Sequence, residues 1–296
     1  MLKRLTVGAV IVAALGLVAF WFLTMPATVL PGALAARTPD VGNGRTMFFA
    51  GGCSSCHAVP KQKDQTRLGG GLALRSPFGT FHVPNISSDP KDGIGAWSEA
   101  QFVTAMTKGV SPDGQHLFPA FPYTSYAHMR VDDVRDLFAF LKTLPAVSGK
   151  VREHDVPFPF NIRRLVGGWK LLFFHDRPFE ADPTKSAQWN RGAYLVNGPA
   201  HCAECHSPRN MLGAIVESRR FAGGPAPDGQ GGVPNITATK LKKWSVQDVA
   251  TMLVDGTTPD SDLVGGSMAE VIANTAKLGA DDRMAMAEYI KSLPAR

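Results

Sequence analysis

Residues 53–57 read Cys-Ser-Ser-Cys-His, and residues 202–206 read Cys-Ala-Glu-Cys-His. The chain of 296 residues contains no other cysteine. Cys-x-x-Cys-His is the pattern to which haem c is attached. On a tight helical turn the two thiols lie along one edge of the porphyrin and form thioethers, and the histidine is the proximal iron ligand. We therefore expect two covalently attached haem c groups, held by Cys53, Cys56 and His57 and by Cys202, Cys205 and His206.

Other uses of a Cys-x-x-Cys pair fit this sequence less well. A tetrahedral zinc site made from both pairs requires that the pairs come together, and it leaves the two histidines unexplained. A redox disulfide of the thioredoxin type needs a βαβ setting, which the apolar pattern lacks.

The two motifs belong to an internal repeat, because other features recur at nearly the same spacing of 149 residues. The repeated features are Gly44–Phe49 with Arg191–Val196, Val-Pro-Asn-Ile at 83–86 and 233–236, Trp-Ser at 97–98 and 244–245, and Asp-Asp through Leu-Pro at 132–145 and 281–294. We interpret this pattern as a duplication that produces two equivalent domains.

Each repeat is predicted to be all-α, because almost no alternating strand pattern appears. The segments 132–145 and 281–294 have apolar residues at helical spacing, with Asp132 and Asp281 as caps and a proline at each end. Serine caps predict helices over 97–108 and 244–254, and the helices before the haem motifs are expected to begin near Gly44 and Ala187. Such a unit forms little core alone and packs around its haem.

The N-terminal stretch, residues 5–23, is uncharged and apolar and follows Lys3 and Arg4. At about 1.5 Å per residue it nearly spans a hydrocarbon core of about 30 Å. The two basic residues place the N-terminus in the cytoplasm and the remainder on the periplasmic side of the inner membrane. We favour a transmembrane anchor; the alternative is a signal peptide cleaved after Ala33-Leu34-Ala35.

These features divide the chain into four parts. The predicted boundaries are 1–36 for the anchor or signal segment, 37–148 for the first haem domain, 149–185 for a linker and 186–296 for the second haem domain. The linker is rich in aromatic residues with basic neighbours, and it is interpreted either as a segment packed across both domains or as a surface that faces a partner or the membrane.

The sixth iron ligands are sought among the methionines. Met268 lies in a glycine-rich stretch after residue 264, where we expect a loop across the distal face of the second haem. In the first repeat Met129 ends the corresponding stretch and is our choice, and its neighbour His128 is the rival. Methionines in predicted helices, such as Met106, are assigned to the core.

Secondary roles are assigned to a few other residues. Pro60 and Pro208 are expected to shape the loop whose carbonyl orients each proximal imidazole. Arg75 and Arg209 are candidate partners for haem propionates. The formal charge of +6 does not indicate nucleic-acid binding, because the basic run at 240–243 contains no aromatic residue.

From about residue 40 onward the sequence resembles the membrane-associated cytochrome c subunits of bacterial periplasmic dehydrogenases, which act on alcohols, gluconate or aldehydes or belong to molybdenum hydroxylases. The resemblance rests on both haem motifs together with the segments 83–86, 93–97, 118–122, 157–163 and 192–196. It implies two tandem class I-like cytochrome c domains behind a transmembrane helix. Many members have three haems, and some have a methionine in place of Phe121.

The resemblance also implies a function. Electrons are expected to leave a periplasmic catalytic subunit, cross the haems and reach quinone, a soluble cytochrome or a terminal oxidase, with no reaction assigned to this chain alone. The alternative is a di-haem redox enzyme such as a peroxidase, which needs one haem with an open coordination position.

Overall fold

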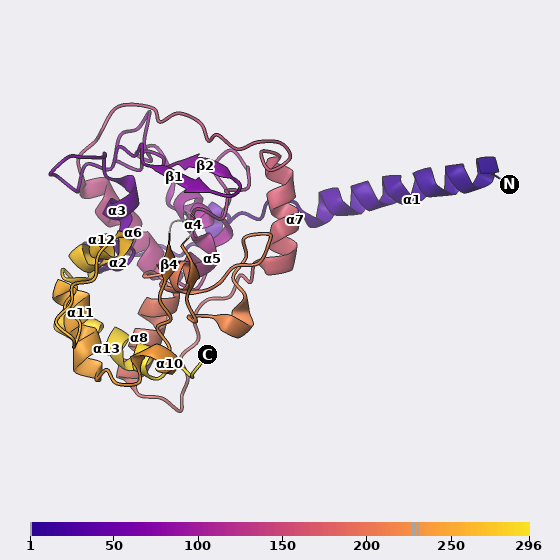
Figure 1. Cartoon of the computed structure of the whole chain (residues 1–296). Coiled ribbons are helices and arrows are strands. Elements are labelled where there is room, and N and C mark those ends of the chain that lie inside the picture. Colours follow the sequence, from indigo (N-terminus) through magenta and orange to yellow (C-terminus); the bar gives the residue numbers. More distant parts are fainter. Residues whose placement is uncertain (1, 227–228, 230) are drawn as a thin grey trace.

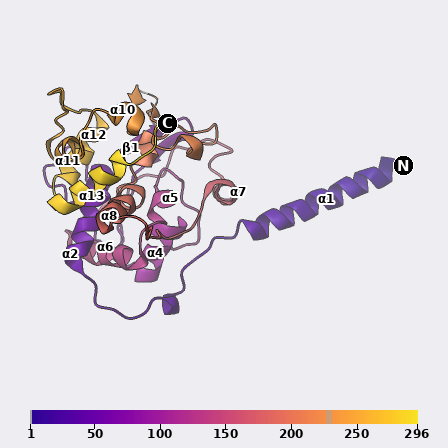
Figure 2. The ribbon, with the colours of Figure 1, turned by 90° about the horizontal axis from the view of Figure 1, so that it is seen from below.

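The computed structural model describes residues 2–226, 229 and 231–296. Within those residues the chain is helical apart from two short hairpins, which confirms the all-α prediction. The first helix, α1 (Leu2–Leu23), projects from the rest of the molecule (Figure 1, Figure 2). Its segment Lys3–Leu23 is long and apolar enough to cross a membrane and is not buried against the protein.

The two repeats contain matching series of elements. The first repeat has α2 (Val41–Ala50), α3 (Cys53–His57), β1 (Ala73–Ser76), β2 (Gly79–His82), α4 (Glu99–Lys108), α5 (Tyr123–Tyr126) and α6 (Val131–Thr143). The second has α8 (Ala187–Asn197), α9 (Ala203–His206), β3 (Gly224–Pro225), β4 (Gly232–Val233), α10 (Ala238–Leu241), α11 (Val246–Asp255), α12 (Ser267–Thr275) and α13 (Ala280–Lys291).

Local hydrogen bonds explain where several helices begin. Ser98 caps α4 and Ser245 caps α11, and each serine forms a capping box with the residue three positions later, as predicted. The predicted caps Asp132 and Asp281 are wrong, because α6 and α13 begin one residue earlier and these carboxylates lie in the first turn. There they still face the positive end of the helix dipole.

In each repeat the first long helix packs against the last, α2 against α6 and α8 against α13. Glycine allows this close approach. A Cβ on Gly44 would lie 2.0 Å from the carbonyl oxygen of Asp136, and one on Gly192 would lie 1.9 Å from that of Ala285. The same contact in both repeats supports the duplication inferred from the sequence.

One hydrophobic core runs through both repeats. Phe102 of α4 stacks on Phe138 of α6 with ring centroids 4.6 Å apart, and buried residues of α8 and α13, such as Leu195 and Met286, belong to the same cluster. The two repeats therefore stabilise one another by burying apolar surface against each other.

The segment between the repeats contains a helix that the sequence did not predict, α7 (Arg163–Phe173). It lies beside the body end of α1 and runs across it (Figure 1, Figure 2). The Arg164 guanidinium lies over the Trp21 ring, 4.0 Å from its centroid. Earlier in this segment, Asp155 pairs with Thr80 of the hairpin β1–β2, so the linker is tied to the first repeat.

Candidate haem sites

Both Cys-x-x-Cys-His motifs form a single helical turn directly after the first long helix of their repeat. In the first motif, α3 begins at Cys53, and in the second, Cys202 immediately precedes α9. Residues three apart on a helix lie on the same side, so each pair of thiols faces one direction. All four cysteines are free, and they are therefore available for thioether bonds.

The histidines are oriented by backbone carbonyls. His57 Nδ1 lies 2.9 Å from the carbonyl oxygen of Pro84, and His206 Nδ1 lies 2.8 Å from that of Pro234. Each Nδ1–H therefore donates to the carbonyl, which leaves the Nε2 lone pair for a metal. Burial lowers the pKa of His57 to about 4 and also lowers the pKa of His206. Both imidazoles are thus held in the neutral form that binds iron.

The prolines that orient the histidines differ from those expected. Pro60 and Pro208 follow the motifs, but the accepting carbonyls belong to Pro84 and Pro234 in the repeated Val-Pro-Asn-Ile segments. That prediction was wrong because the carbonyl comes from a distant loop that folds back over the motif. The repetition of Val-Pro-Asn-Ile was the signal in the sequence that could have identified these residues.

A glycine in each repeat holds the motif to that returning loop. Gly70 N donates to the carbonyl of His57 and Gly223 N donates to that of His206, both at 2.8 Å. Both glycines have positive φ, at 71° and 73°, and a Cβ on either would lie 2.5 to 2.6 Å from the backbone of the Val-Pro segment. Sequence reasoning missed this pair, because the two glycines lie at different distances from their histidines.

The two motifs meet at the interface between the repeats through reciprocal contacts. From the first motif, Ser54 Oγ donates to Asn274 Oδ1 at 3.1 Å, and Asn274 Nδ2 donates to Ser55 Oγ at 2.9 Å. From the second motif, Glu204 accepts the hydroxyls of Thr124 and Ser125 at 2.7 and 2.9 Å. Each motif therefore packs against the loop helix, α12 or α5, of the other repeat.

Glu204 is a buried carboxylate that is fully paired. Burial alone would raise its pKa, but Arg209, whose Nη2 lies 2.7 Å from Glu204 Oε2, and the hydroxyl donors lower the pKa overall. Arg209 is thus engaged within the protein, and not free for a propionate as expected. Arg75 is exposed on β1.

Tyr126 lies between the two motifs. Its ring packs edge-on against His201, which precedes the second motif, with centroids 5.5 Å apart. Burial raises its pKa well above the ordinary value, with further contributions from Cys53 and Cys56 of the first motif. The pKa of Cys56 is raised by burial and, in addition, by Cys205 of the other motif. The two attachment sites are therefore close to each other.

The two predicted methionine ligands occupy different settings. Met268 is partly buried and lies in the first turn of α12, so the predicted loop is wrong at this point. Met268 lies on the same side of α12 as Ile272 and Thr275, which are buried. Met129 is enclosed in the core with 1% of its surface exposed. Its rival His128 bonds through Nδ1 to the carbonyl of Arg177 in the linker, at 2.8 Å.

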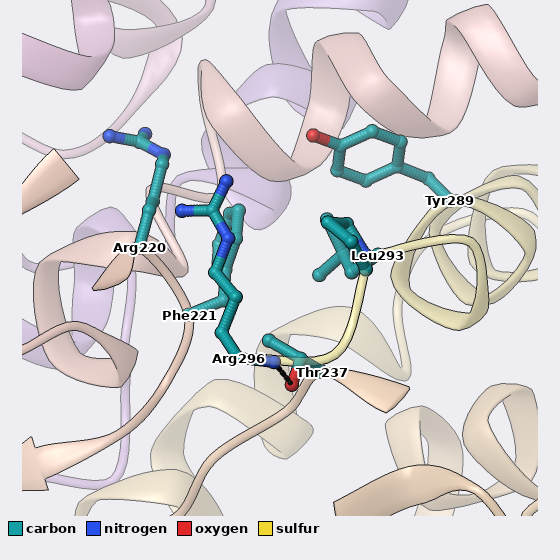
Figure 3. A pocket seen from close by; sticks show the side chains of 7 residues that line it. Arg220, Phe221, Thr237, Tyr289, Leu293 and Arg296 are labelled. Carbon is teal, nitrogen blue, oxygen red and sulfur yellow. Dashed lines mark hydrogen bonds between the residues drawn. The ribbon is translucent and has the colours of Figure 1, made fainter. Parts of the chain in front are cut away.

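A small pocket adjoins the second motif. It has a volume of about 170 Å³ and is lined by Arg220, Phe221, Tyr289 and Arg296, among others (Figure 3). The side chains of Arg220 and Arg296 extend into it side by side. Arg220 is close enough to Cys202 to act against the rise in its pKa that burial causes. Arg220 Nη1 is paired with the Glu217 carboxylate at 3.1 Å, and Arg296 Nη1 donates to the Glu217 carbonyl at 2.7 Å, so both guanidinium groups are engaged within the protein.

Comparison with known proteins agrees with this geometry. A family model for cytochrome c matches residues 41–145. The chain is 47% identical over 297 residues to a diheme cytochrome c-type protein of Cereibacter sphaeroides, and the match covers 100% of this chain and 99% of that protein.

Two further relatives are larger proteins. A nicotinate dehydrogenase subunit of Pseudomonas putida is 38% identical over 95% of this chain, which spans 24% of that protein. The fructose dehydrogenase cytochrome subunit of Gluconobacter japonicus is 36% identical over 90% of this chain, which spans 55% of that protein. The full-length match and the two cysteine pairs lead to one conclusion: the chain belongs to the family of di-haem c-type cytochromes.

Proposed function

We propose that this chain carries electrons between a periplasmic dehydrogenase and the respiratory chain. One haem is held by Cys53, Cys56 and His57, and the other by Cys202, Cys205 and His206 with Met268 as sixth ligand. The haem units correspond to residues 37–148 and 186–296, joined by 149–185. Met129 as sixth ligand of the first haem stays a prediction.

The residues present fit the cofactor. When bound, each haem supplies an iron centre that takes up and releases one electron. The chain provides neutral imidazoles whose Nδ1–H is fixed by a carbonyl, and thiols that face one edge of the site. The shared apolar core packs against both motifs through Cys53 and Cys202, which are partly buried.

The reciprocal contact between the two motifs is the observation that carries the proposal. The pairs Ser54–Asn274 and Ser125–Glu204 each join one motif to a loop helix of the other repeat. Buried hydrogen bonds of this kind hold both attachment sites at a fixed separation. A fixed, short separation is what transfer from one haem to the next requires.

The partners are inferred from the relatives. The fructose dehydrogenase and nicotinate dehydrogenase proteins are named as subunits of dehydrogenases. We infer that electrons enter this chain from a catalytic dehydrogenase subunit and leave to quinone, a soluble cytochrome or a terminal oxidase.

Two features support a place at the inner membrane, with the haem units on the periplasmic side. The first is α1, which is apolar and unburied and has Lys3 and Arg4 in its first turn. The second is what we call the α7 face, which consists of Leu165, Leu171 and Leu172. These side chains are 43%, 55% and 66% exposed beside the body end of α1. An exposed apolar patch of this kind marks a surface that contacts a partner or a membrane.

The proposal is tested on the full chain purified by affinity tag from its native membranes. We expect two haems per chain in the pyridine haemochrome assay and a copurified dehydrogenase whose substrate reduces both haems anaerobically. Alcohols, fructose, gluconate and nicotinate are the first substrates to try. A chain that is isolated with two haems but that no copurified enzyme reduces contradicts the proposal.

A matched pair of variants tests transfer between the haems. Cys53→Ala with Cys56→Ala, and Cys202→Ala with Cys205→Ala, each remove one attachment site. Both are expected to stop substrate-driven reduction of an added acceptor, because the path then contains a single haem. Acceptor reduction at the wild-type rate in either variant contradicts the proposed path.

A further inference from the structure

The loops that follow α4 and α11 begin with the same turn. Leu117 N donates to the carbonyl of Gly109 at 2.8 Å, and Val264 N donates to that of Gly256 at 2.9 Å. Both glycines end their helix in the left-handed conformation. The two loops can therefore be aligned from this turn, although the second is longer by two residues overall, since Leu278 lies 14 residues after Val264 and Met129 lies 12 residues after Leu117.

Four residues beyond that turn, the first repeat has Phe121 and the second has Met268. Phe121 packs against Tyr126, with ring centroids 5.5 Å apart. Tyr126 in turn lies close enough to Cys53 and Cys56 that both thiols raise its pKa. Counted from that turn, Phe121 therefore has the place in the first repeat that Met268 has in the second, and it packs on a tyrosine that adjoins both motifs.

The ends of the two loops also match, and they give Met129 a different counterpart. Met129 N donates to Tyr126 at 2.9 Å, and Leu278 N donates to Thr275 at 3.0 Å, each to the backbone carbonyl. Both residues stand three positions before the Asp-Asp pair of their repeat. Met129 is 1% exposed and Leu278 is 6% exposed. Met129 therefore occupies a position that the second repeat fills with a core leucine.

The other two methionines of the first repeat have leucine counterparts as well. Met47 and Leu195 each lie three residues after the glycine at the helix crossing, and both are fully buried. Met106 and Leu253 each lie three residues before the glycine that ends their helix, and they are 6% and 3% exposed. Every methionine between residues 37 and 148 thus matches a buried leucine.

Two histidines of the first repeat are bonded through Nε2. His82 Nε2 lies 3.0 Å from a carboxylate oxygen of Asp155, and His116 Nε2 lies 2.8 Å from the carbonyl of Thr24. His128 and His201 are bonded through Nδ1, to the carbonyls of Arg177 and Pro199, and the charged groups that act on His128 include Arg220 and Glu217 of the second repeat.

We propose that the first haem, attached as inferred under the proposed function, has His57 as its only protein ligand and an open sixth position beside Phe121. A phenyl ring fills space without offering a lone pair or a hydrogen-bond donor. Such a position favours a small uncharged ligand that donates a lone pair to ferrous iron, of which carbon monoxide is the simplest. Binding forms one iron–ligand bond, breaks no protein bond and moves no electron out of the site.

The test is carbon monoxide titration of the reduced full-length protein in detergent, followed by visible difference spectra. We expect about one carbon monoxide for every two haems. In the ferric protein, the far-red band of methionine–iron ligation should have about half the intensity expected for two methionine-ligated haems. A protein that contains two haems but binds no carbon monoxide overturns the proposal.

Three variants decide which side chains are ligands. Phe121→Met is expected to abolish carbon monoxide binding and to raise the far-red band, because it places a thioether where the second repeat has one. Met268→Leu is expected to raise the stoichiometry to about two. Met129→Leu is expected to leave it at about one; an increase on this substitution identifies Met129 as a ligand and overturns the proposal.

The haem count separates this proposal from the proposed function. A count of one haem per chain means that attachment itself has failed, and both proposals then fail. If the protein contains two haems and electron paramagnetic resonance shows that the first haem has two histidine ligands, the open sixth position is wrong and the proposed function still stands. If Phe121→Met does not fold, as judged by circular dichroism, the wild-type stoichiometry and Met129→Leu still decide the matter.

Discussion

Lys170 is a half-buried lysine that joins two helices at the end of the body beside α1. Its Nζ donates to the carbonyls of Lys108 and Gly109, both at 2.7 Å, where α4 ends. The ammonium also lies over the Tyr123 ring, 4.7 Å from its centroid. Burial lowers the pKa of Lys170 to about 7 from its ordinary value of 10.5. A cation at a helix C-terminus is favourable, but here burial disfavours the charge.

This lowered pKa predicts how stability depends on pH. Below about pH 7 the lysine is protonated in both folded and unfolded chains. Between about pH 7 and the ordinary value of 10.5, only the unfolded chain keeps the proton, so the free energy of unfolding rises with pH. Lys170→Met should lack this rise, which thermal unfolding at about pH 6 and about pH 9 measures. Lys240→Met, in the exposed turn α10, is the control and should retain it.

The residues of the site differ in how far the sequence predicts them. The spacing of Cys53, Cys56 and His57 is a local pattern, and the structure places all three on one turn. The carbonyl of Pro84 could not be predicted by proximity, because the loop that carries it returns from 27 residues away. Met129 was chosen as the only methionine in the expected loop; the Asp-Asp pair three positions later already equates it with Leu278 in the sequence, and the hydrogen bonds at the end of the loop support that register.

At the scale of elements, the glycines at the two helix crossings predict a clear loss of stability. Alanine at Gly44 or Gly192 would place a Cβ about 2 Å from a backbone oxygen of the facing helix, which cannot move without separating the pair. Each substitution should lower the free energy of unfolding by about 1–3 kcal/mol. Urea unfolding followed by circular dichroism measures the change.

Gly42 provides the matched control within α2. It is exposed, and a Cβ there meets only Asp40 Oδ1, 3.2 Å away, which caps the helix by accepting from Asn43 N and needs to shift by only a few tenths of an ångström. Gly42→Ala should therefore be neutral or should stabilise the protein by up to about 1 kcal/mol, the difference in helix propensity. Equal losses at Gly42 and Gly44 would contradict a role for close helix approach.

The elements that the sequence predicts are those with local signals. Ser98 and Ser245 identify the starts of α4 and α11, since a cap and its helix are adjacent in sequence. The helix α7 was not predicted, because Gly167 and Gly168 interrupt its pattern. In the structure these two glycines let the helix approach α1, with Thr24 and Phe20 within 3.0 Å of the Cβ positions. A helix of this kind depends on a contact distant in sequence.

At the scale of the whole molecule, α1 and the α7 face define one side of the protein. The helix α7 runs across the body end of α1 (Figure 1), so under the proposed anchoring by α1 it would lie along the plane of the membrane. Trp169 of α7 donates to the carbonyl of Leu212, and Met211 and Leu212 are 94% and 52% exposed. The second repeat therefore adds apolar surface to the same side. A membrane interface accommodates such a face.

A thiol-reactive fluorophore tests this arrangement in the full chain, since the four native cysteines are proposed to be bonded to haem. Leu172→Cys is labelled on the α7 face, Val12→Cys within α1, and Val254→Cys on α11, where the side chain is 40% exposed on the far side of the body. The proteins are reconstituted in vesicles of phosphatidylethanolamine and phosphatidylglycerol that contain lipids with a quencher near the headgroup.

We expect these lipids to quench the label at Leu172 and aqueous iodide to quench the label at Val254, because apolar side chains of an interfacial helix enter the acyl boundary by about 5–10 Å. If iodide quenches Leu172 as strongly as Val254 while Val12 stays protected, α1 is an anchor but the α7 face does not touch the membrane.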